Sequence, residues 1–267
     1  MLKIVVTNIG FGDSNPNALK KLKQLADVDL NTEGKRYNTS EMIEVLQQAD
    51  IVIAGTEPLN KQVLGSVNKL KLIARLGVGL DSVDLHTAKE KGIFVCYTPE
   101  PPAVAVAELT VSLMLALIKN IPNINQSTKC GEWVRPMGRN LSGMNIGLIG
   151  LGRVARQVID LLQGFKDIHF FGYDSVVKNI TNVEITTLSN LLQQSDLVSL
   201  HVPLTEQTKN LLNLKMLNLM KPDSYIINTA RGGIIDEEAL YYMLQNKKIA
   251  GAALDVLVVE PPKMDNP

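Results

Sequence analysis

The sequence has little of what marks membrane, secreted or nucleic-acid-binding proteins. Its two cysteines, Cys96 and Cys130, lie far apart in no metal-ligand spacing, so we expect reduced, partly buried thiols of a cytoplasmic protein. Lys plus Arg and Asp plus Glu are equal at 27, which gives no field favouring nucleic acid or an anionic membrane. The longest apolar run, 103–118, is interrupted by Glu108 and is shorter than the ~20 residues that cross a bilayer. A small-molecule ligand is therefore expected.

Short β-branched runs alternate with helical patterns along the 267 residues. This alternation predicts α/β architecture with parallel, doubly wound sheets, and the length suits two domains. Consecutive prolines in 98–102 break the pattern and predict a hinge. We therefore expect one domain at 1–98 and a second at 99–267. Strands are expected at 2–7, 51–54, 72–74, 94–97, 145–149, 168–173, 197–200, 225–228 and 249–254, and helices at 16–26, 83–91, 103–120, 153–165, 188–194 and 237–245.

The expected helix at 103–120 is apolar on almost every face. Such a helix is typically buried on all sides, between domains or between subunits. We favour a homodimer contact through this region over a purely intradomain role.

A glycine-rich turn follows the expected strand at 145–149 and opens an amphipathic helix. Gly150 permits the tight turn, and Gly152 lets the backbone approach a pyrophosphate at the helix N-terminus. Ala155 stands where a third glycine is often found. Alone, this pattern is also met in ordinary strand-to-helix turns.

About 20 residues further on, Asp174 ends the next expected strand, where dinucleotide-binding folds place an acid for the ribose hydroxyls. Its carboxylate repels a 2′-phosphate, and no arginine lies at 175–177 to receive one. Together, the glycines and this acid predict NAD rather than NADP as the cofactor.

Turn residues follow three later strands, at the edge where open α/β sheets bind ligands. Arg231, followed by two glycines, can pair bidentately with a carboxylate, or it is a surface arginine in a turn. Glu260 follows another strand end and is either a functional acid or a solvated loop acid. Its spacing alone does not decide between the two interpretations. The other strand-end positions are His201, Val202, Pro203, Leu204, Thr208, Asn228, Thr229, Ala230 and Asp255.

Several ordered motifs make the sequence resemble the D-isomer-specific 2-hydroxyacid dehydrogenases, most closely their phosphoglycerate dehydrogenase-like branch. These motifs are 74–81, the glycine loop, 201–204, 228–233 and 251–256. The resemblance implies hydride transfer between NAD(H) and a small D-2-hydroxy or 2-keto acid. It also implies a flavodoxin-like substrate domain followed by a Rossmann dinucleotide-binding domain.

The resemblance assigns roles that the residues left open. Arg231 would hold the substrate carboxylate and polarise the carbonyl, and Glu260 would raise the pKa of a histidine acid–base group. The turn Gly77-Val78-Gly79 would present N–H groups to the same carboxylate, although by itself it reads equally as a plain tight turn. The implied cofactor contacts are Gly150, Gly152, Arg153, Val154, Asp174, Val202, Pro203, Thr208, Thr229, Ala230, Arg231 and Asp255, the last near the nicotinamide carboxamide.

The sequence departs from the family in its histidines. Family members carry the catalytic histidine in a Pro-His segment after the glutamate, whereas this chain ends at Pro267. His86 lies in an expected helix, His169 in a strand and His201 in the cofactor turn, so none matches. We expect a chain truncated at its C-terminus, without the histidine and the return segment of the first domain, and inactive or strongly impaired.

A second departure concerns the substrate. Phosphoglycerate enzymes tend to place basic or hydroxyl groups in the first domain where this chain has Gly55-Thr56-Glu57-Pro58, and a carboxylate there repels a phosphate. Two rivals remain: an NAD(H)-sensing, non-catalytic protein of the corepressor type, and a Rossmann-type methyltransferase. The sequence has no basic patch, which argues against the corepressor type. The motif Arg231-Gly232-Gly233 does not support a methyltransferase.

Overall fold

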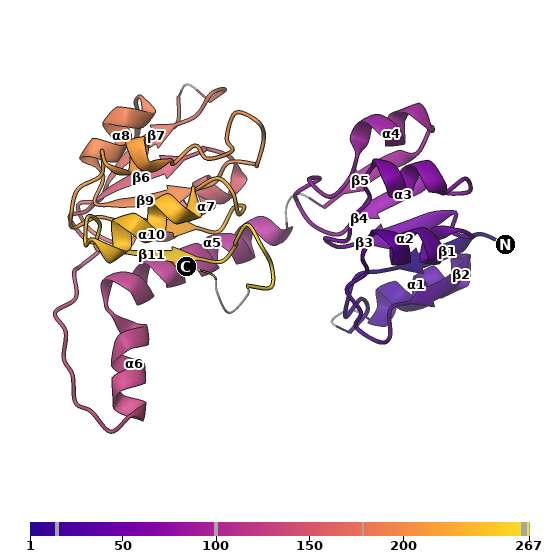
Figure 1. Cartoon of the computed structure of the whole chain (residues 1–267), viewed down its shortest axis with the longest axis horizontal. Coiled ribbons are helices and arrows are strands. Elements are labelled where there is room, and N and C mark those ends of the chain that lie inside the picture. The colour runs from indigo at the N-terminus through magenta and orange to yellow at the C-terminus, as the bar shows by residue number, and fades with distance from the viewer. Residues whose placement is uncertain (14–15, 99–100, 178, 263–265, 267) are drawn as a thin grey trace. The chain divides into compact units, whose positions relative to one another are not determined.

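The structure, a computed structural model, describes residues 1–267 except 14–15, 99–100, 178, 263–265 and 267. The chain divides into two compact units, Met1–Pro102 and Ala103–Pro267, and each has its own parallel sheet (Figure 1). The expected pair of doubly wound α/β sheets is thereby confirmed. The hinge expected at 98–102 includes residues outside the described part of the chain, so the boundary at 98/99 stays a prediction.

The first unit is built on a five-stranded parallel sheet with the order β2-β1-β3-β4-β5. The chain reverses direction across the sheet between β1 and β3, which is the switch point where such sheets bind ligands. The strands are β1 (Lys3–Val6), β2 (Asp27–Leu30), β3 (Ile51–Ala54), β4 (Leu72–Arg75) and β5 (Phe94–Tyr97). The helices are α1 (Pro16–Leu25), α2 (Thr39–Leu46), α3 (Lys61–Ser66) and α4 (Leu85–Glu90).

Short polar side chains start three of these helices. Asn38 accepts hydrogen bonds from two N–H groups of α2, while Asn60 and Asp84 each accept one from α3 and α4. The apolar face of α2, with Met42 and Leu46 fully buried, packs on the sheet. The caps and this packing fix the loops at the carboxyl ends of β3 and β4.

The second unit has a six-stranded parallel sheet with the order β11-β10-β9-β6-β7-β8. Read from β8, this is the strand order of a Rossmann dinucleotide-binding domain, with its switch point between β6 and β9. The strands are β6 (Asn145–Ile149), β7 (His169–Tyr173), β8 (Val183–Ile185), β9 (Leu197–Leu200), β10 (Tyr225–Asn228) and β11 (Gly251–Leu254). The helices are α5 (Pro101–Ile118), α6 (Ile121–Lys129), α7 (Arg153–Leu162), α8 (Leu188–Gln194), α9 (Leu214–Leu217) and α10 (Glu237–Gln245).

Central strands of this sheet are apolar on both faces because helices cover both. All four residues of β9 are buried, as are the last four of β6. Helix α7 buries Val158, Ile159 and Leu162 against the sheet and turns its charged face outward. This packing holds the turn between β6 and α7 in place.

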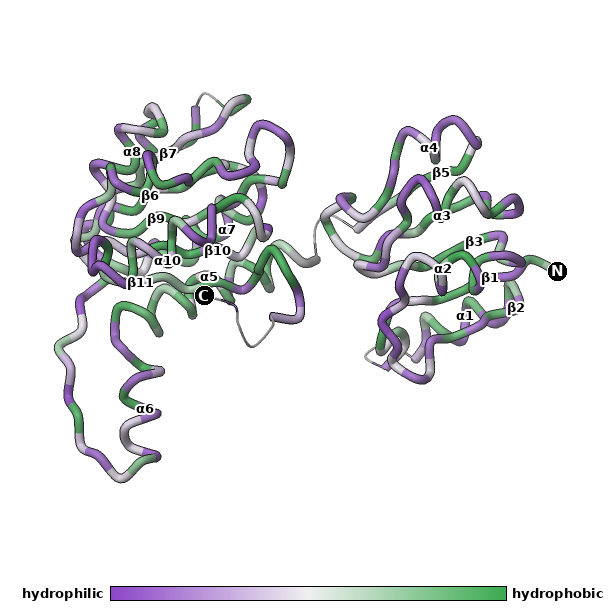
Figure 2. Tube along the Cα trace, viewed as in Figure 1, coloured by the Kyte–Doolittle hydropathy of each residue, from purple (hydrophilic) through white to green (hydrophobic). Residues whose placement is uncertain are grey.

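Helix α5 was expected to be buried on all sides, but within this chain only one face is. Ala107, Met114 and Ile118 are fully buried, whereas Val104 and Leu109 are exposed. Apolar residues on the outer face of α5 give the helix the continuous apolar character that the sequence shows (Figure 2).

Helix α6 and the returning segment to about residue 140 project from the second unit (Figure 1). None of the α6 residues is buried, and Trp133 and Met137 are 80% and 96% exposed. We call residues 121–140 the arm. No single described helix could cross a membrane, although α5 and α6, bent by 63°, together satisfy the length and composition criteria.

Both cysteines are free, as expected, but they are exposed rather than partly buried. Cys96 lies on β5, the edge strand of its sheet, and Cys130 ends α6 in the arm. Position at an edge and on a projection accounts for the difference, which the local sequence does not reveal.

Candidate functional site

The turn between β6 and α7 accepts only glycine at its first position. Gly150 has φ +92°, and a Cβ there would lie 2.5 Å from the carbonyl oxygen of His201. Its N–H donates to the carbonyl of Tyr173 at 2.8 Å. The turn is therefore pressed against the ends of both neighbouring strands, β7 and β9.

The N-terminus of α7 faces open space. Gly152 is the N-cap and supplies no side chain, and nothing lies within 4 Å of where its Cβ would be. Ala155, at the third fingerprint position, is fully buried. N–H groups of the first helical turn lack intrahelical partners and carry the positive end of the helix dipole. A pyrophosphate fits this cradle, with Arg153 exposed and Val154 half-buried beside it.

Asp174 is tied to this turn. One carboxylate oxygen accepts from the N–H of Leu151 at 2.8 Å, and the other accepts from Val176 and Val177 at 2.8 and 2.9 Å. A carboxylate offers about four acceptor positions, so it can also accept from a ribose hydroxyl. The acid identified by spacing and the glycine turn thus form one unit.

The loop after β10 is locked by Asn228, a residue that the sequence analysis treated only as a strand-end position. Its side chain donates to the carbonyl of Arg231 at 2.9 Å and accepts from the N–H of Ala230 at 3.0 Å. Gly232 must be glycine, because a Cβ there would collide with the backbone of Leu257. Arg231 is half-buried, and its Nη1 donates to the carbonyl of Ala230 at 2.6 Å.

Thr229 connects this loop to α5. Its hydroxyl lies 2.8 Å from that of Thr110, and both side chains are buried. Sequence reasoning missed Thr110, because a lone threonine within an apolar helix carries no local signal. The pair fixes the height of the β10 loop above the sheet.

The turn after β9 closes on itself. Thr208 donates to the carbonyl of Pro203 at 2.6 Å and accepts from the N–H of Thr205 at 2.7 Å, so its hydroxyl shapes the turn. Val202 is half-buried and Pro203 is exposed. The Nε2 atom of His201 is buried without a hydrogen-bond partner in the described part of the chain, and burial lowers the pKa of His201 to about 4.

Asp255 and Glu260 are both exposed in the segment after β11. The N–H of Asp255 donates to the carbonyl of Asn228 at 2.9 Å, which places it at the same sheet edge as Arg231. Glu260 accepts from the N–H of Leu257 at 2.9 Å. The carboxyl ends of β6, β7, β9, β10 and β11 thus bring the predicted cofactor residues to one edge, because all these strands are parallel.

In the first unit, the predicted carboxylate-binding turn follows β4. Gly77, at φ +144°, donates its N–H to the hydroxyl of Thr98 at 2.8 Å, so that donor is already used. Among the described residues, the N–H groups of Val78 and Gly79 have no partner. A Cβ on Gly77 would collide with the guanidinium of Arg75, which accounts for this glycine. An anion site here would therefore use Val78 and Gly79.

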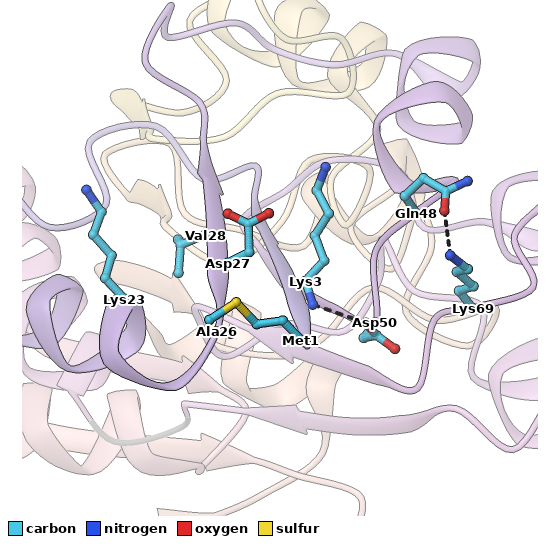
Figure 3. A pocket seen from close by; sticks show the side chains of 9 residues that line it. All are labelled: Met1, Lys3, Lys23, Ala26, Asp27, Val28, Gln48, Asp50 and Lys69. Carbon is cyan, nitrogen blue, oxygen red and sulfur yellow. Dashed lines mark hydrogen bonds between the residues drawn. The ribbon is translucent and has the colours of Figure 1, made fainter.

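A separate pocket lies at the opposite, amino edge of this sheet (Figure 3). It is lined by residues at or before the starts of the strands, including Lys3, Asp27 and Asp50. Ligands of open α/β sheets bind at the carboxyl edge, so this pocket is not the candidate site. No group of three or more potential metal-ligating His, Cys, Asp or Glu side chains occurs among the described residues.

Comparison with known proteins gives consistent matches. Residues 111–267 match the profile described as "D-isomer specific 2-hydroxyacid dehydrogenase, NAD binding domain". The chain is 39% identical to a D-3-phosphoglycerate dehydrogenase of Methanocaldococcus jannaschii, covering all of this chain and 51% of that relative, or about half its length. It is 38% identical to a hydroxypyruvate reductase of Thermotoga maritima, covering 88% of this chain and 78% of the relative. A D-lactate dehydrogenase of Aquifex aeolicus, solved with NAD and lactic acid, aligns at TM-score 0.86 and 30% identity over 99% of this chain and 82% of that one.

Proposed function

This chain belongs to the D-isomer-specific 2-hydroxyacid dehydrogenases, and from that premise we propose that its protein transfers a hydride between NAD(H) and a small 2-hydroxy or 2-oxo acid. One observation carries the proposal: the uncapped N-terminus of α7, Asp174 and the Arg231 loop occur together at the carboxyl edge of one Rossmann-ordered sheet. Structural glycine turns lack such a convergent set of polar groups.

The cofactor, when bound, supplies or accepts the hydride. The chain's own residues orient it: N–H groups of α7 take the pyrophosphate, and Asp174 takes the adenine-side ribose hydroxyls. The negative charge of Asp174 disfavours the 2′-phosphate of NADP. The remaining proposed contacts are Arg153, Val154, Val202, Pro203, Thr208, Thr229, Ala230 and Asp255.

Arg231 holds the substrate carboxylate with its planar fork and stabilises negative charge on the carbonyl oxygen as the hydride arrives. In the first unit, the N–H groups of Val78 and Gly79 are the proposed donors to a substrate carboxylate. Glu260 orients an acid–base histidine and raises the pKa of that histidine. Arg231 and Glu260 are thus the proposed catalytic pair of this chain.

None of the three histidines within these 267 residues suits that acid–base role. His86 is exposed beside Glu90 on α4 of the first unit. His169 is exposed beside Glu184 at the start of β7, at the amino edge of the Rossmann sheet. The pKa of about 4 leaves His201 unprotonated near neutral pH, so it has no proton to donate. We therefore propose that the 267-residue chain binds NADH but turns over slowly.

A homodimer through α5 is also proposed. The outer face of α5 exposes Val104 and Leu109, and the neighbouring arm exposes Trp133 and Met137. Apolar side chains at this density mark protein contacts. Light scattering should give twice the chain mass, and Trp133→Ser should lower it, whereas Phe94→Ser, an exposed aromatic outside α5 and the arm, should not. A monomeric wild type contradicts the proposal.

A cytoplasmic location is proposed from the two free thiols.

The proposed activity is tested with NADH and a panel of 2-oxo acids, followed at the nicotinamide absorbance. Wild type and Arg231→Lys are compared in the full-length gene product. The lysine keeps the charge but loses the fork, so turnover should fall at least ~10²-fold while NADH binding changes little. NADH binding without turnover of any 2-oxo acid would favour a sensing role, and near-normal turnover by the lysine variant would remove Arg231 from the mechanism.

A further inference from the structure

Glu57 and Arg75 are the only charged side chains that are buried among the described residues, each about 9% exposed. Both lie in the first unit: Glu57 follows β3, and Arg75 is the last residue of the neighbouring parallel strand β4. Burying a charge is costly unless other groups compensate. The buried charge of Glu57, in a chain with 54 acidic and basic residues, calls for an account in terms of ligand binding.

Glu57 stands at the switch point of its sheet. It follows β3, while Asn8 follows β1, and the chain reverses direction between these two strands. A Cβ placed on Gly55 would lie 2.9 Å from the amide nitrogen of Asn8 and 3.2 Å from the nearer carboxylate oxygen of Glu57. The two side chains therefore flank Gly55 where a ligand of this fold is expected.

The carboxylate of Glu57 has acceptor capacity left over. One oxygen accepts from the N–H of Gly55 at 2.6 Å. Within the described part of the chain, no Lys, Arg or His nitrogen lies within 4.0 Å of it. A carboxylate can accept about four hydrogen bonds, so donors from a ligand would satisfy it.

Resting on the proposed function, we propose that Glu57 sets substrate specificity by accepting a hydrogen bond from the distal end of the 2-oxo acid. The substrate carboxylate binds at Val78 and Gly79 of the same unit, and the distal group carries a hydroxyl, ammonium or guanidinium donor. A distal phosphate, with close to two negative charges, is repelled by Glu57. Glu57 is thus a specificity residue that selects against phosphorylated substrates.

The test compares wild type with Glu57→Gln in the full-length gene product. Glutamine keeps an acceptor for the Gly55 N–H and removes the charge. Glu44→Gln is the matched control, because it makes the same charge change on an exposed position of the same unit. Four substrates are used. Hydroxypyruvate and 2-oxobutanoate are matched in size and differ in the distal hydroxyl, 3-phosphohydroxypyruvate adds a phosphate, and 5-guanidino-2-oxopentanoate is the cationic probe.

Wild type should prefer hydroxypyruvate over both 2-oxobutanoate and the phosphorylated acid. In Glu57→Gln, the ratio of kcat/KM for 3-phosphohydroxypyruvate to that for hydroxypyruvate should rise at least ~10-fold, and use of the guanidino acid should fall. Equal loss on all four substrates, or an unchanged ratio, would reduce Glu57 to a turn-stabilising residue and overturn the proposal. If wild type turns over no 2-oxo acid, the proposed function fails instead, and calorimetric binding of the same compounds to the NADH-saturated protein decides the role of Glu57.

Discussion

At the scale of single residues, the sequence predicts those positions whose role depends on neighbouring residues in the chain. Asp174 was identified from its distance to the glycines and is indeed bonded to the N–H of Leu151. The locking role of Asn228 was not found, because its hydrogen bonds to Ala230 and Arg231 depend on how the loop is folded. Thr110 was not found, because its contact with Thr229 joins segments far apart in sequence. The exposure of Cys96 was missed for the same reason: an edge strand is defined by its neighbours.

Asp174→Ala should weaken NADH binding about 10- to 100-fold, because charge-assisted hydrogen bonds worth roughly 1.5–3 kcal/mol are lost. The preference over NADPH should narrow. Since the carboxylate also holds Leu151, Val176 and Val177, the melting temperature is measured alongside the NADH titration. Unchanged NADH affinity in a folded variant would show that Asp174 does not contact the ribose.

His201 predicts an acid-sensitive second unit. Its pKa of about 4 in the folded chain lies below the ordinary 6.5, so the unfolded chain binds more protons between these values. Stability is therefore fully present above about pH 6.5 and is lost as the pH falls toward 4. From pH 7 to 5 the loss should be on the order of 1–2 kcal/mol.

His201→Phe should flatten this slope in urea melts, because phenylalanine fills the site without titrating. His86→Gln, at an exposed histidine of the first unit, is the control and should leave the slope as in wild type. Identical slopes in wild type and His201→Phe would mean that His201 is solvated when folded.

At the scale of elements, strands and helices with strong apolar patterns were predicted to within a few residues. Strands at 51–54, 145–149, 197–200 and 225–228 have the bounds expected. The missed elements, which include β2, β8 and α6, are short or polar and owe their structure to pairing or position rather than to pattern. Helix α5 was found with one face buried in its own unit, and burial of its other face against a domain or subunit stays a prediction.

The two glycines of the β6–turn–α7 element have different predicted roles: Gly150 is needed for folding, and Gly152 is needed for cofactor binding. Gly152→Ala places a methyl group in open space at a negative φ, so the unit should fold with little change in melting temperature. The methyl group would occupy the approach to the pyrophosphate, and NADH affinity should fall at least ~10-fold. Gly150→Ala should instead unfold the unit, because its Cβ meets the His201 carbonyl.

Gly164→Ala is the matched control for Gly152→Ala, since it also adds a methyl group where nothing lies within 4 Å but stands beyond the far end of α7. It should retain both stability and NADH affinity. If Gly152→Ala binds NADH like the control, the pyrophosphate does not rest on α7.

At the scale of the whole molecule, the alternation of strands and helices predicts parallel sheets joined by right-handed crossovers, but not the strand order of each sheet. The candidate site of the second unit needs more than topology, because its residues follow five different strands, β6, β7, β9, β10 and β11. The glycines and Asp174 predicted an NAD-binding domain, which the family match confirms, whereas the roles of the individual site residues stay predictions. The hydrogen bond from the N–H of Gly77 to the hydroxyl of Thr98 was not predicted.

The 267-residue chain should bind NADH measurably and turn over 2-oxo acids at least ~10²-fold more slowly than a protein with a positioned acid–base group. The missing contribution is proton transfer, since Arg231 and the cofactor turn are present. NADH titrations and rates are compared for this chain and the full-length gene product. If the full-length product extends beyond residue 267 and both proteins turn over at comparable rates, another group of the 267-residue chain transfers the proton. His201 would then be the first residue to substitute.

The most direct test of the account follows the hydride itself. NADH deuterated at C4 is incubated with the full-length gene product and hydroxypyruvate, and the 2-hydroxy acid formed is examined by mass spectrometry. Our account predicts one deuterium at C2 of the product, with the label absent in Arg231→Lys at matched times. NADH binding with no labelled product from hydroxypyruvate or any other 2-oxo acid would contradict it.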